Sequence, residues 1–208
     1  MKKLFLIVCL CWFSANSNAA LLELDIRAGQ LHGAINVDVG GTFYDVEFLD
    51  GTCASIFGGC DSASDFVFQS LASATLAAQS ILDLLLQDSV LGLFDNDHAL
   101  TFGCSHSNQC NVDTPYAAES ENDYFRIFVV SALNFEDSFG SDRASQADYP
   151  NFFDFENNSA RVFAKWSLSD NQGNTQGGND SMSVSEPSQI GLMLLLLLIP
   201  LFRSKLVN

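Results

Sequence analysis

The sequence predicts an α+β domain in which one main helix packs on a mostly antiparallel sheet, with two local disulfide loops. Several segments alternate apolar and polar residues, one segment has helical apolar spacing, and four cysteines lie in two close pairs. Apolar residues make up 48% of the 208-residue chain, which includes 18 phenylalanines, so the chain can build a packed core.

The first elements expected are a strand and a β-hairpin. Leu22, Leu24 and Ile26 alternate with charged residues, as in a half-buried strand. Gly40-Gly41 allows the positive φ angles of a two-residue turn between two alternating segments. This register puts the apolar residues on one face and Asn36 on the other. The expected cross-strand partners are Val39 with Thr42, Val37 with Tyr44 and Ile35 with Val46.

The main helix is expected after a short strand. Phe66 and Phe68 alternate within 65–69, and Ser70 is a suitable N-cap for a helix running to about Gln87. Small residues in the first half of this helix would let it lie close to a sheet. The apolar stripe consists of Leu71, Ala74, Ala78, Ile81, Leu82 and Leu85.

Two further strands are expected at 124–133 and 161–168. In 124–133, the odd-numbered residues and the even-numbered residues are both largely apolar. This pattern indicates a strand that is buried on both faces. The predicted order is therefore four strands, one helix and two strands.

The cysteine spacing favours disulfides within two short loops. Four cysteines follow residue 19, and four cysteines allow three pairings. Local pairing is favoured because both intervening loops hold small, polar residues that turn easily. The alternative is a zinc site completed by His98 or His106, although the Cys intervals are longer than those typical of zinc ligands. The favoured pairs are Cys53 with Cys60 and Cys104 with Cys110.

Residues 1–19 have the pattern of a secretory signal peptide. Lys2 and Lys3 precede an apolar run, and Ser17 and Ala19 suit a signal peptidase cut before Ala20. Residues 20–169 then form the exported domain. Residues 170–184 have the composition of a flexible linker.

The C-terminal segment, residues 185–208, combines a short motif, an apolar run and a basic end. The motif is Ser185-Glu186-Pro187, and the apolar run from Ile190 to Phe202 has 13 residues, fewer than the roughly 20 that span a bilayer comfortably. Basic residues after the run are expected to stay on the cytoplasmic side and so hold the exported domain to the membrane. The alternative is a plain C-terminal anchor.

This order of features resembles the PEP-CTERM sorting signal, with Ser185 where the name-giving motif has proline. The resemblance covers about the last 25 residues. It implies recognition by an exosortase, a membrane protease, and delivery to the cell surface or extracellular matrix. It implies where the protein is delivered, and it does not imply an enzymatic reaction.

The middle of the chain, about residues 42 to 116, resembles a group of exported PEP-CTERM proteins described by their tail. This resemblance supports the domain plan and the cysteine pairs. The segments that carry it are Tyr44-Asp45-Val46, Asp50-Gly51-Thr52-Cys53, Gly59-Cys60-Asp61, Leu93-Phe94-Asp95, Gly103-Cys104, Cys110 and Thr114-Pro115-Tyr116.

The net charge narrows the classes of molecule that the protein is expected to bind. The chain carries a net charge of −16, and residues 20–185 have five basic and 24 acidic residues, a net charge of −19. This acidity argues against nucleic-acid binding, which depends on basic patches. A surface this negative attracts divalent cations and repels acidic polysaccharides.

Candidate chemistry is sparse, and no catalytic residues are assigned. The chain has no His-Glu-x-x-His, nucleophile-elbow or phosphate-loop motif. Asp95 and Asp97 resemble the opening of a calcium loop, which leaves calcium as a possible cofactor, although Ala99 and Leu100 rule out an EF-hand.

Three classes of function stay open: a non-enzymatic surface or matrix protein, a calcium- or polysaccharide-binding module, and an unrecognised hydrolase. An exopolysaccharide is a candidate partner because aromatic side chains can stack on sugars. Four aromatics occur within seven residues: Tyr149, Phe152, Phe153 and Phe155.

Overall fold

The computed structural model describes residues 21–136, 138, 140–156 and 158–170. The chain divides into two compact units, 1–173 and 174–208, and the second lies outside the described residues. The signal peptide, the linker from residue 171 onward and the C-terminal segment also lie outside them.

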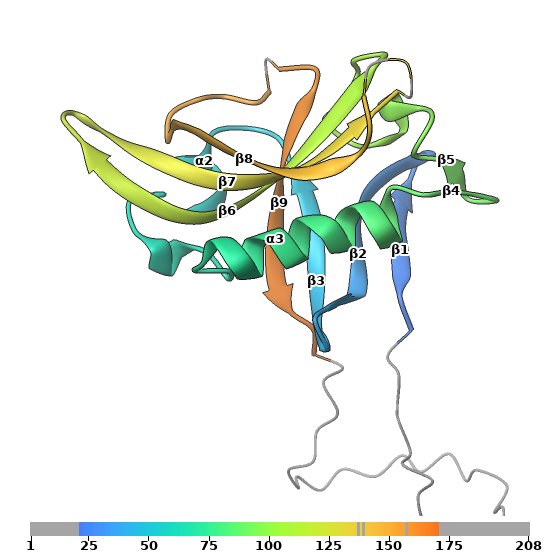
Figure 1. The fold of residues 1–208 in the computed structure, drawn as a ribbon, viewed down its shortest axis with the longest axis horizontal. Helices are drawn as coiled ribbons and strands as arrows, with labels where there is room; N and C mark the ends of the chain where they lie inside the picture. Colours follow the sequence, from blue (N-terminus) through green and yellow to red (C-terminus); the bar gives the residue numbers. More distant parts are fainter. Residues whose placement is uncertain (1–20, 137, 139, 157, 171–208) are drawn as a thin grey trace, which may run out of the picture. The chain divides into compact units, whose positions relative to one another are not determined.

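Seven strands form one sheet in the spatial order β1-β2-β3-β9-β6-β7-β8 (Figure 1). All neighbouring pairs are antiparallel except β6 with β9, which confirms the predicted mostly antiparallel sheet. The strands are β1 (Glu23–Arg27), β2 (Gln30–Val39), β3 (Thr42–Leu49), β6 (Gln109–Glu121), β7 (Tyr124–Phe135), β8 (Arg143–Pro150) and β9 (Arg161–Leu168).

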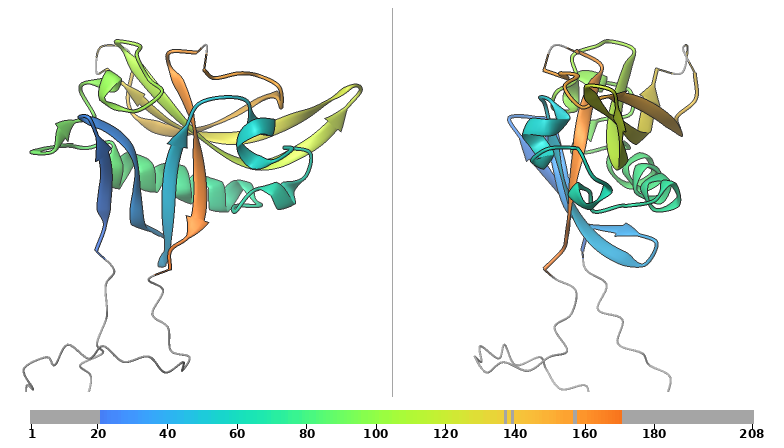
Figure 2. Two further views of the ribbon diagram at one scale, coloured as in Figure 1. Left: turned by 180° about the vertical axis from the view of Figure 1, so that it is seen from behind. Right: turned by 90° about the vertical axis from the view of Figure 1, so that its left-hand side faces the viewer.

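One main helix, α3, covers one face of the sheet, and the short helix α2 lies on the opposite face (Figure 2). A π-helical turn, η2, continues α3, and a small hairpin follows it. These elements are α2 (Cys53–Phe57), η1 (Ala63–Asp65), α3 (Leu71–Ser80), η2 (Ile81–Leu85), β4 (Asp88–Ser89), β5 (Gly92–Leu93) and η3 (His98–Leu100).

The two helices define two hydrophobic cores. The larger core lies between α3 and the sheet and contains the disulfide Cys104–Cys110. The smaller core lies under α2 and contains the disulfide Cys53–Cys60. Both local pairings are therefore confirmed, and each core has one covalent crosslink.

The β2–β3 hairpin turns at Gly40-Gly41, as predicted, but its register shifts farther from the turn. Val39 pairs with Thr42 and Val37 with Tyr44. The predicted pairing of Ile35 with Val46 is wrong, because a bulge places Ala34 opposite Val46. Asn36 adopts a left-handed φ of 58° in this bulge and is buried, whereas Ile35 is 39% exposed.

Helix α3 begins where the sequence predicted. The Ser70 hydroxyl accepts a hydrogen bond from the backbone N–H of Ser73 at 3.2 Å. The helical segment ends with η2 at Leu85, two residues before the expected end. The face toward the sheet starts at Ala74, because Leu71 is 38% exposed. The buried residues are Ala74, Ala77, Ala78, Ile81, Leu82 and Leu85.

One predicted strand is absent, and two long strands of the sheet were not predicted. Residues 65–69 do not form a strand: η1 ends at Asp65, and Phe66 and Phe68 enter different cores. Their alternation reflects burial on two sides rather than pairing in a sheet. Strands β6 and β8 were not predicted, because polar residues interrupt their apolar pattern.

The sheet splits between β6 and β9. These strands pair over only three residues each, 111–113 with 161–163, and then diverge (Figure 1). Across the opening, the indole N–H of Trp166 donates a hydrogen bond to the Thr114 hydroxyl at 3.1 Å. Beyond the split, β9 pairs with β3 and β6 pairs with β7.

Both ends of the described domain are tied to Asn36. Its side-chain N–H donates to the Leu21 carbonyl at 3.0 Å, and its side-chain oxygen accepts from the Ser169 hydroxyl at 2.6 Å. The first and last described residues therefore lie on the same side of the domain (Figure 1). The prediction that Asn36 lies on the face opposite the apolar residues is wrong, because the bulge turns it inward.

Candidate functional site

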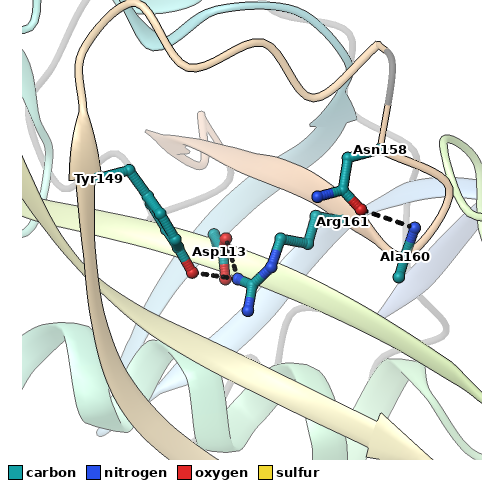
Figure 3. A network of polar contacts seen from close by, with 5 residues as sticks. All are labelled: Asp113, Tyr149, Asn158, Ala160 and Arg161. Carbon is teal, nitrogen blue, oxygen red and sulfur yellow. Dashed lines mark hydrogen bonds and ion pairs between the residues drawn. The ribbon is translucent and has the colours of Figure 1, made fainter.

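A buried ion pair joins three strands at the smaller core. Asp113 on β6 has no exposed surface, and it accepts a hydrogen bond from the Arg161 guanidinium on β9 at 2.9 Å (Figure 3). Arg161 also donates to the Tyr149 hydroxyl on β8, and its guanidinium lies 5.0 Å from the centre of the Tyr149 ring. Ser131 on β7 pairs directly with Asp113 across the sheet.

This network has a structural role. Burial raises the pKa of Asp113, and the positive charge of Arg161 opposes that rise. Burial, followed by the nearby Asp113 charge, raises the pKa of Tyr149. A carboxylate with no exposed surface cannot meet a substrate, so the ion pair fixes the positions of β6, β8 and β9 instead.

Above this network, the loop after β8 is fastened on both sides. The Asn151 N–H donates to the Phe125 carbonyl at 2.8 Å, and its own carbonyl accepts from the Ala54 N–H at 3.3 Å. Four residues later, Phe155 is buried and stacks on Phe163 with ring centres 4.2 Å apart. Residues 152 and 153 are therefore held between two fixed points.

The aromatic side chains of this loop remain partly at the surface. Phe152 is 63% exposed and packs edge-on against Tyr124, with ring centres 5.8 Å apart. Phe153 is 39% exposed, and the centre of its ring lies 5.7 Å from the centre of the half-buried Tyr149 ring. We call Tyr124, Tyr149, Phe152 and Phe153 the aromatic platform.

A group of carboxylates follows the platform along the chain. Asp154 and Glu156 lie close enough to Asp50 for their charges to act on it. The pKa of Asp50 is raised to about 6. Burial is the largest cause of this rise, and the negative charges of Glu156 and then Asp154 add to it. A shallow cleft of about 380 Å³ includes Asp50, Glu156 and Gly103 in its lining.

A second cleft, of about 360 Å³, opens where β6 and β9 diverge. Phe57 and Phe66 line it from the α2 side, and Lys165 and Trp166 line it from β9. Lys165 stands opposite Glu47 in the β3–β9 register, so the two side chains lie on the same face of the sheet.

The predicted calcium ligands Asp95 and Asp97 lie in the loop after the β4–β5 hairpin. The Asp88 carboxylate accepts hydrogen bonds from the backbone N–H groups of Asp95 and Asn96 and from the Asn96 side chain. The Asn96 side-chain hydrogen bond is the largest cause that lowers the pKa of Asp88. Within the described residues, no three His, Cys, Asp or Glu side chains group as a metal site, so calcium stays a prediction.

The zinc alternative is wrong because all four cysteines that it required form disulfides. His98 is buried, and neither ring nitrogen makes a hydrogen bond to a described residue. His106 is exposed, and its Nδ1 accepts from the Asn108 N–H at 3.2 Å.

Sequence reasoning found only part of the aromatic platform. The close spacing of aromatic residues predicts Tyr149, Phe152 and Phe153, but it also predicts Phe155, which belongs to the core. Tyr124 was missed because β7 brings it to the loop from 28 residues earlier in the chain. The acidic pattern gave no signal that Asp50 would meet Asp154 and Glu156.

No family model matches this chain, and comparisons with curated proteins and with solved structures find no match. In the part of the chain that the structure describes, every helix is too short or too polar to cross a bilayer.

Proposed function

We propose that this protein is an exported, non-enzymatic surface or matrix protein, delivered through its C-terminal sorting segment. The observation that carries the proposal is the pair of local disulfides, one in each core. Disulfides persist in oxidising compartments outside the cytoplasm. A signal peptide at residues 1–19 supplies the route of export.

Residues 185–208 act as the sorting signal in this proposal. Signal peptidase and an exosortase-type protease are the proposed processing partners, and Ser185, Glu186 and Pro187 form the proposed recognition motif. The apolar run at 190–202 holds the chain in the inner membrane until processing releases the domain.

Variants of the motif test the sorting step in the native host. Glu186→Ala/Pro187→Ala should accumulate in the membrane fraction with a larger mass, while the wild-type chain reaches the surface or medium. Ser188→Ala, immediately after the motif, is the matched control and should behave like wild type. Equal distribution of all three proteins would show that the motif plays no part in sorting.

A second candidate function is polysaccharide binding by the aromatic platform. The supporting observation is the exposure of Phe152 and Phe153 between two fixed points, Asn151 and Phe155. Exposed aromatic rings offer flat apolar faces on which sugar rings stack. Their loop lies away from the side where the described ends leave the domain (Figure 1).

Electrophoresis through gels containing the exopolysaccharide of the native host tests this second function. Wild type should be retarded, and Phe152→Ala/Phe153→Ala should migrate as it does without polysaccharide. Val90→Ala, at the fully exposed tip of the β4–β5 hairpin, is the matched control for loss of an exposed apolar group. Undiminished retardation of the double variant would exclude the platform.

A further inference from the structure

We infer that the cleft where β6 and β9 diverge binds a small carboxylic acid that carries an aromatic ring. Aromatic side chains line this cleft, and Lys165 adds a positive charge to the lining. The cleft is separate from the aromatic platform, and the inference does not rest on the proposed export or polysaccharide binding.

The cleft is large enough for a small molecule. Its volume of about 360 Å³ falls within the range of small-molecule pockets in proteins. It opens beyond Asp113 and Phe163, the last residues that pair β6 with β9 (Figure 1). Pro115 of β6 and Ala164 and Trp166 of β9 belong to its lining and are buried. The floor of the cleft is therefore held by the sheet itself.

The aromatic side chains of the cleft hold one another in place. Phe57 packs edge-on against Phe66, with ring centres 5.5 Å apart, and Phe68 packs edge-on against Trp166, with ring centres 5.4 Å apart. The hydrogen bond to Thr114 also fixes the Trp166 indole. Since these rings are already ordered, little further conformational entropy is lost when a ligand binds. A ligand ring among them can make the edge-to-face contacts that aromatic rings favour.

Lys165 differs from the other basic residues of the described domain. Three arginines form ion pairs with carboxylates, and Arg143 lies with its guanidinium 5.3 Å from the centre of the Phe135 ring. The paired arginines are Arg27, Arg126 and Arg161. Lys165 is exposed and forms no ion pair with any described residue. Its ammonium group is therefore available to a ligand in the cleft.

The carboxylates nearest to Lys165 have other positions or other partners. Asp65 lines the cleft, but its Oδ2 accepts hydrogen bonds from the backbone N–H groups of Asp61 and Ser62, at 3.1 and 3.2 Å. Glu47 stands opposite Lys165 in the β3–β9 register, but it lines the neighbouring cleft and not this one. Lys165 is therefore the charged group of the lining that is left for a ligand, and a carboxylate matches its charge.

Fluorescence titration tests this ligand class, because the Trp166 indole lines the cleft. The protein is isolated from its host with disulfides intact, and every form carries Trp12→Phe, which leaves Trp166 as the only tryptophan in the chain. The probes are 3-phenylpropanoate, 3-phenylpropanol and 3-phenylpropylamine, which differ in charge but share the ring and chain. At neutral pH the acid should bind about fivefold more tightly than the alcohol, and the amine should bind most weakly.

Substitutions of Lys165 separate its charge from the contacts of the rings. Lys165→Met should bind the acid and the alcohol equally, Lys165→Glu should prefer the amine, and Lys165→Arg should keep the preference for the acid. Arg143→Met and Arg143→Glu make the same changes of charge on the edge strand β8 and should bind like wild type. Both side chains are exposed, so all five variants should fold.

Four results would overturn the inference. One is equal binding of the acid and the alcohol to the unsubstituted cleft, and another is the lack of a saturable change in Trp166 fluorescence with any probe. A preference for the acid that survives Lys165→Met would show that another cation holds the carboxylate. Loss of that preference in Arg143→Met would show a general effect of net charge. The proposed sorting is tested separately by the motif variants.

Discussion

Arg161 forms an ion pair with a carboxylate that is buried away from water. Its guanidinium bonds to Asp113, which has no exposed surface, and to Tyr149 on a third strand. A buried ion pair contributes little compared with apolar residues, but removal of one partner leaves the other charge uncompensated. The pair therefore constrains how β6, β8 and β9 are arranged.

Arg161→Met should destabilise the protein by about 3–5 kcal/mol at neutral pH, measured by urea unfolding. Loss of the arginine raises the pKa of Asp113 further above its value in the unfolded chain. The folded variant then binds this proton more tightly than the unfolded chain, so the loss should be smaller at low pH.

The exposed pair of Arg27 with Asp25 provides the control. Arg27→Met should leave the free energy of unfolding nearly unchanged at either pH, because an exposed ion pair contributes little to stability. If Arg161→Met were equally mild, Asp113 would have to be hydrated, and the network could not be a structural constraint.

Asp50 gives a second pH dependence at the scale of one residue. Its pKa is raised to about 6, so the folded protein binds this proton more tightly than the unfolded chain. The stabilisation is present below about pH 4 and is lost as the pH rises through about 6. Asp50→Asn should therefore have a higher Tm than wild type at pH 7.

This gain in Tm should shrink toward pH 4, where the wild-type carboxyl group is protonated. Asp83→Asn, on the exposed side of η2, should leave the Tm nearly unchanged at both pH values. A Tm difference for Asp50→Asn that is the same at pH 4 and pH 7 would contradict the assigned pKa.

At the scale of elements, β2 depends on Gly33. This residue has a φ of 144°, and a Cβ atom there would lie 2.0 Å from the Val46 carbonyl oxygen of β3. Gly33→Ala should therefore cost at least about 2 kcal/mol of unfolding free energy, because the strand backbones must separate. Chemical denaturation measures the loss.

Gly29→Ala separates backbone strain from collision. Gly29 has a φ of 85°, but no atom within 4 Å would meet its Cβ, so only the conformational cost of about 1 kcal/mol applies. Equal losses for the two variants would contradict the close approach of β2 to β3.

The elements that the sequence predicted correctly are those with local signals. The Gly40-Gly41 turn, the Ser70 cap and the short cysteine loops each involve residues fewer than ten positions apart. The bulge at Asn36 was not predictable in this way, because it depends on contacts with Leu21 and Ser169 at the two ends of the domain.

Strand β6 was missed for a related reason. It carries Asn111, Asp113 and Pro115, residues that disfavour a buried strand on average. Distant parts of the fold accommodate these residues. The buried Asp113 forms an ion pair with Arg161, and Pro115 lies just beyond the point where β6 leaves β9. Partners so far away in the chain leave no periodic pattern in the sequence.

At the scale of the whole molecule, the described ends leave on one side, and the loop after β8 lies away from them (Figure 1). If both ends are processed at the membrane, as proposed, this arrangement keeps the platform accessible during export. The sequence predicted three of the four platform residues. The fourth, Tyr124, reaches the loop through the path of β7, which the sequence does not reveal.

The measurement that most directly tests the central claim is the intact mass of the protein isolated from its native host. Export, sorting and two disulfides predict a chain that starts near Ala20, ends at Ser185 to Pro187 and lacks four hydrogens. A mass that retains residues 190–208, or cysteines that remain free thiols, would contradict the account.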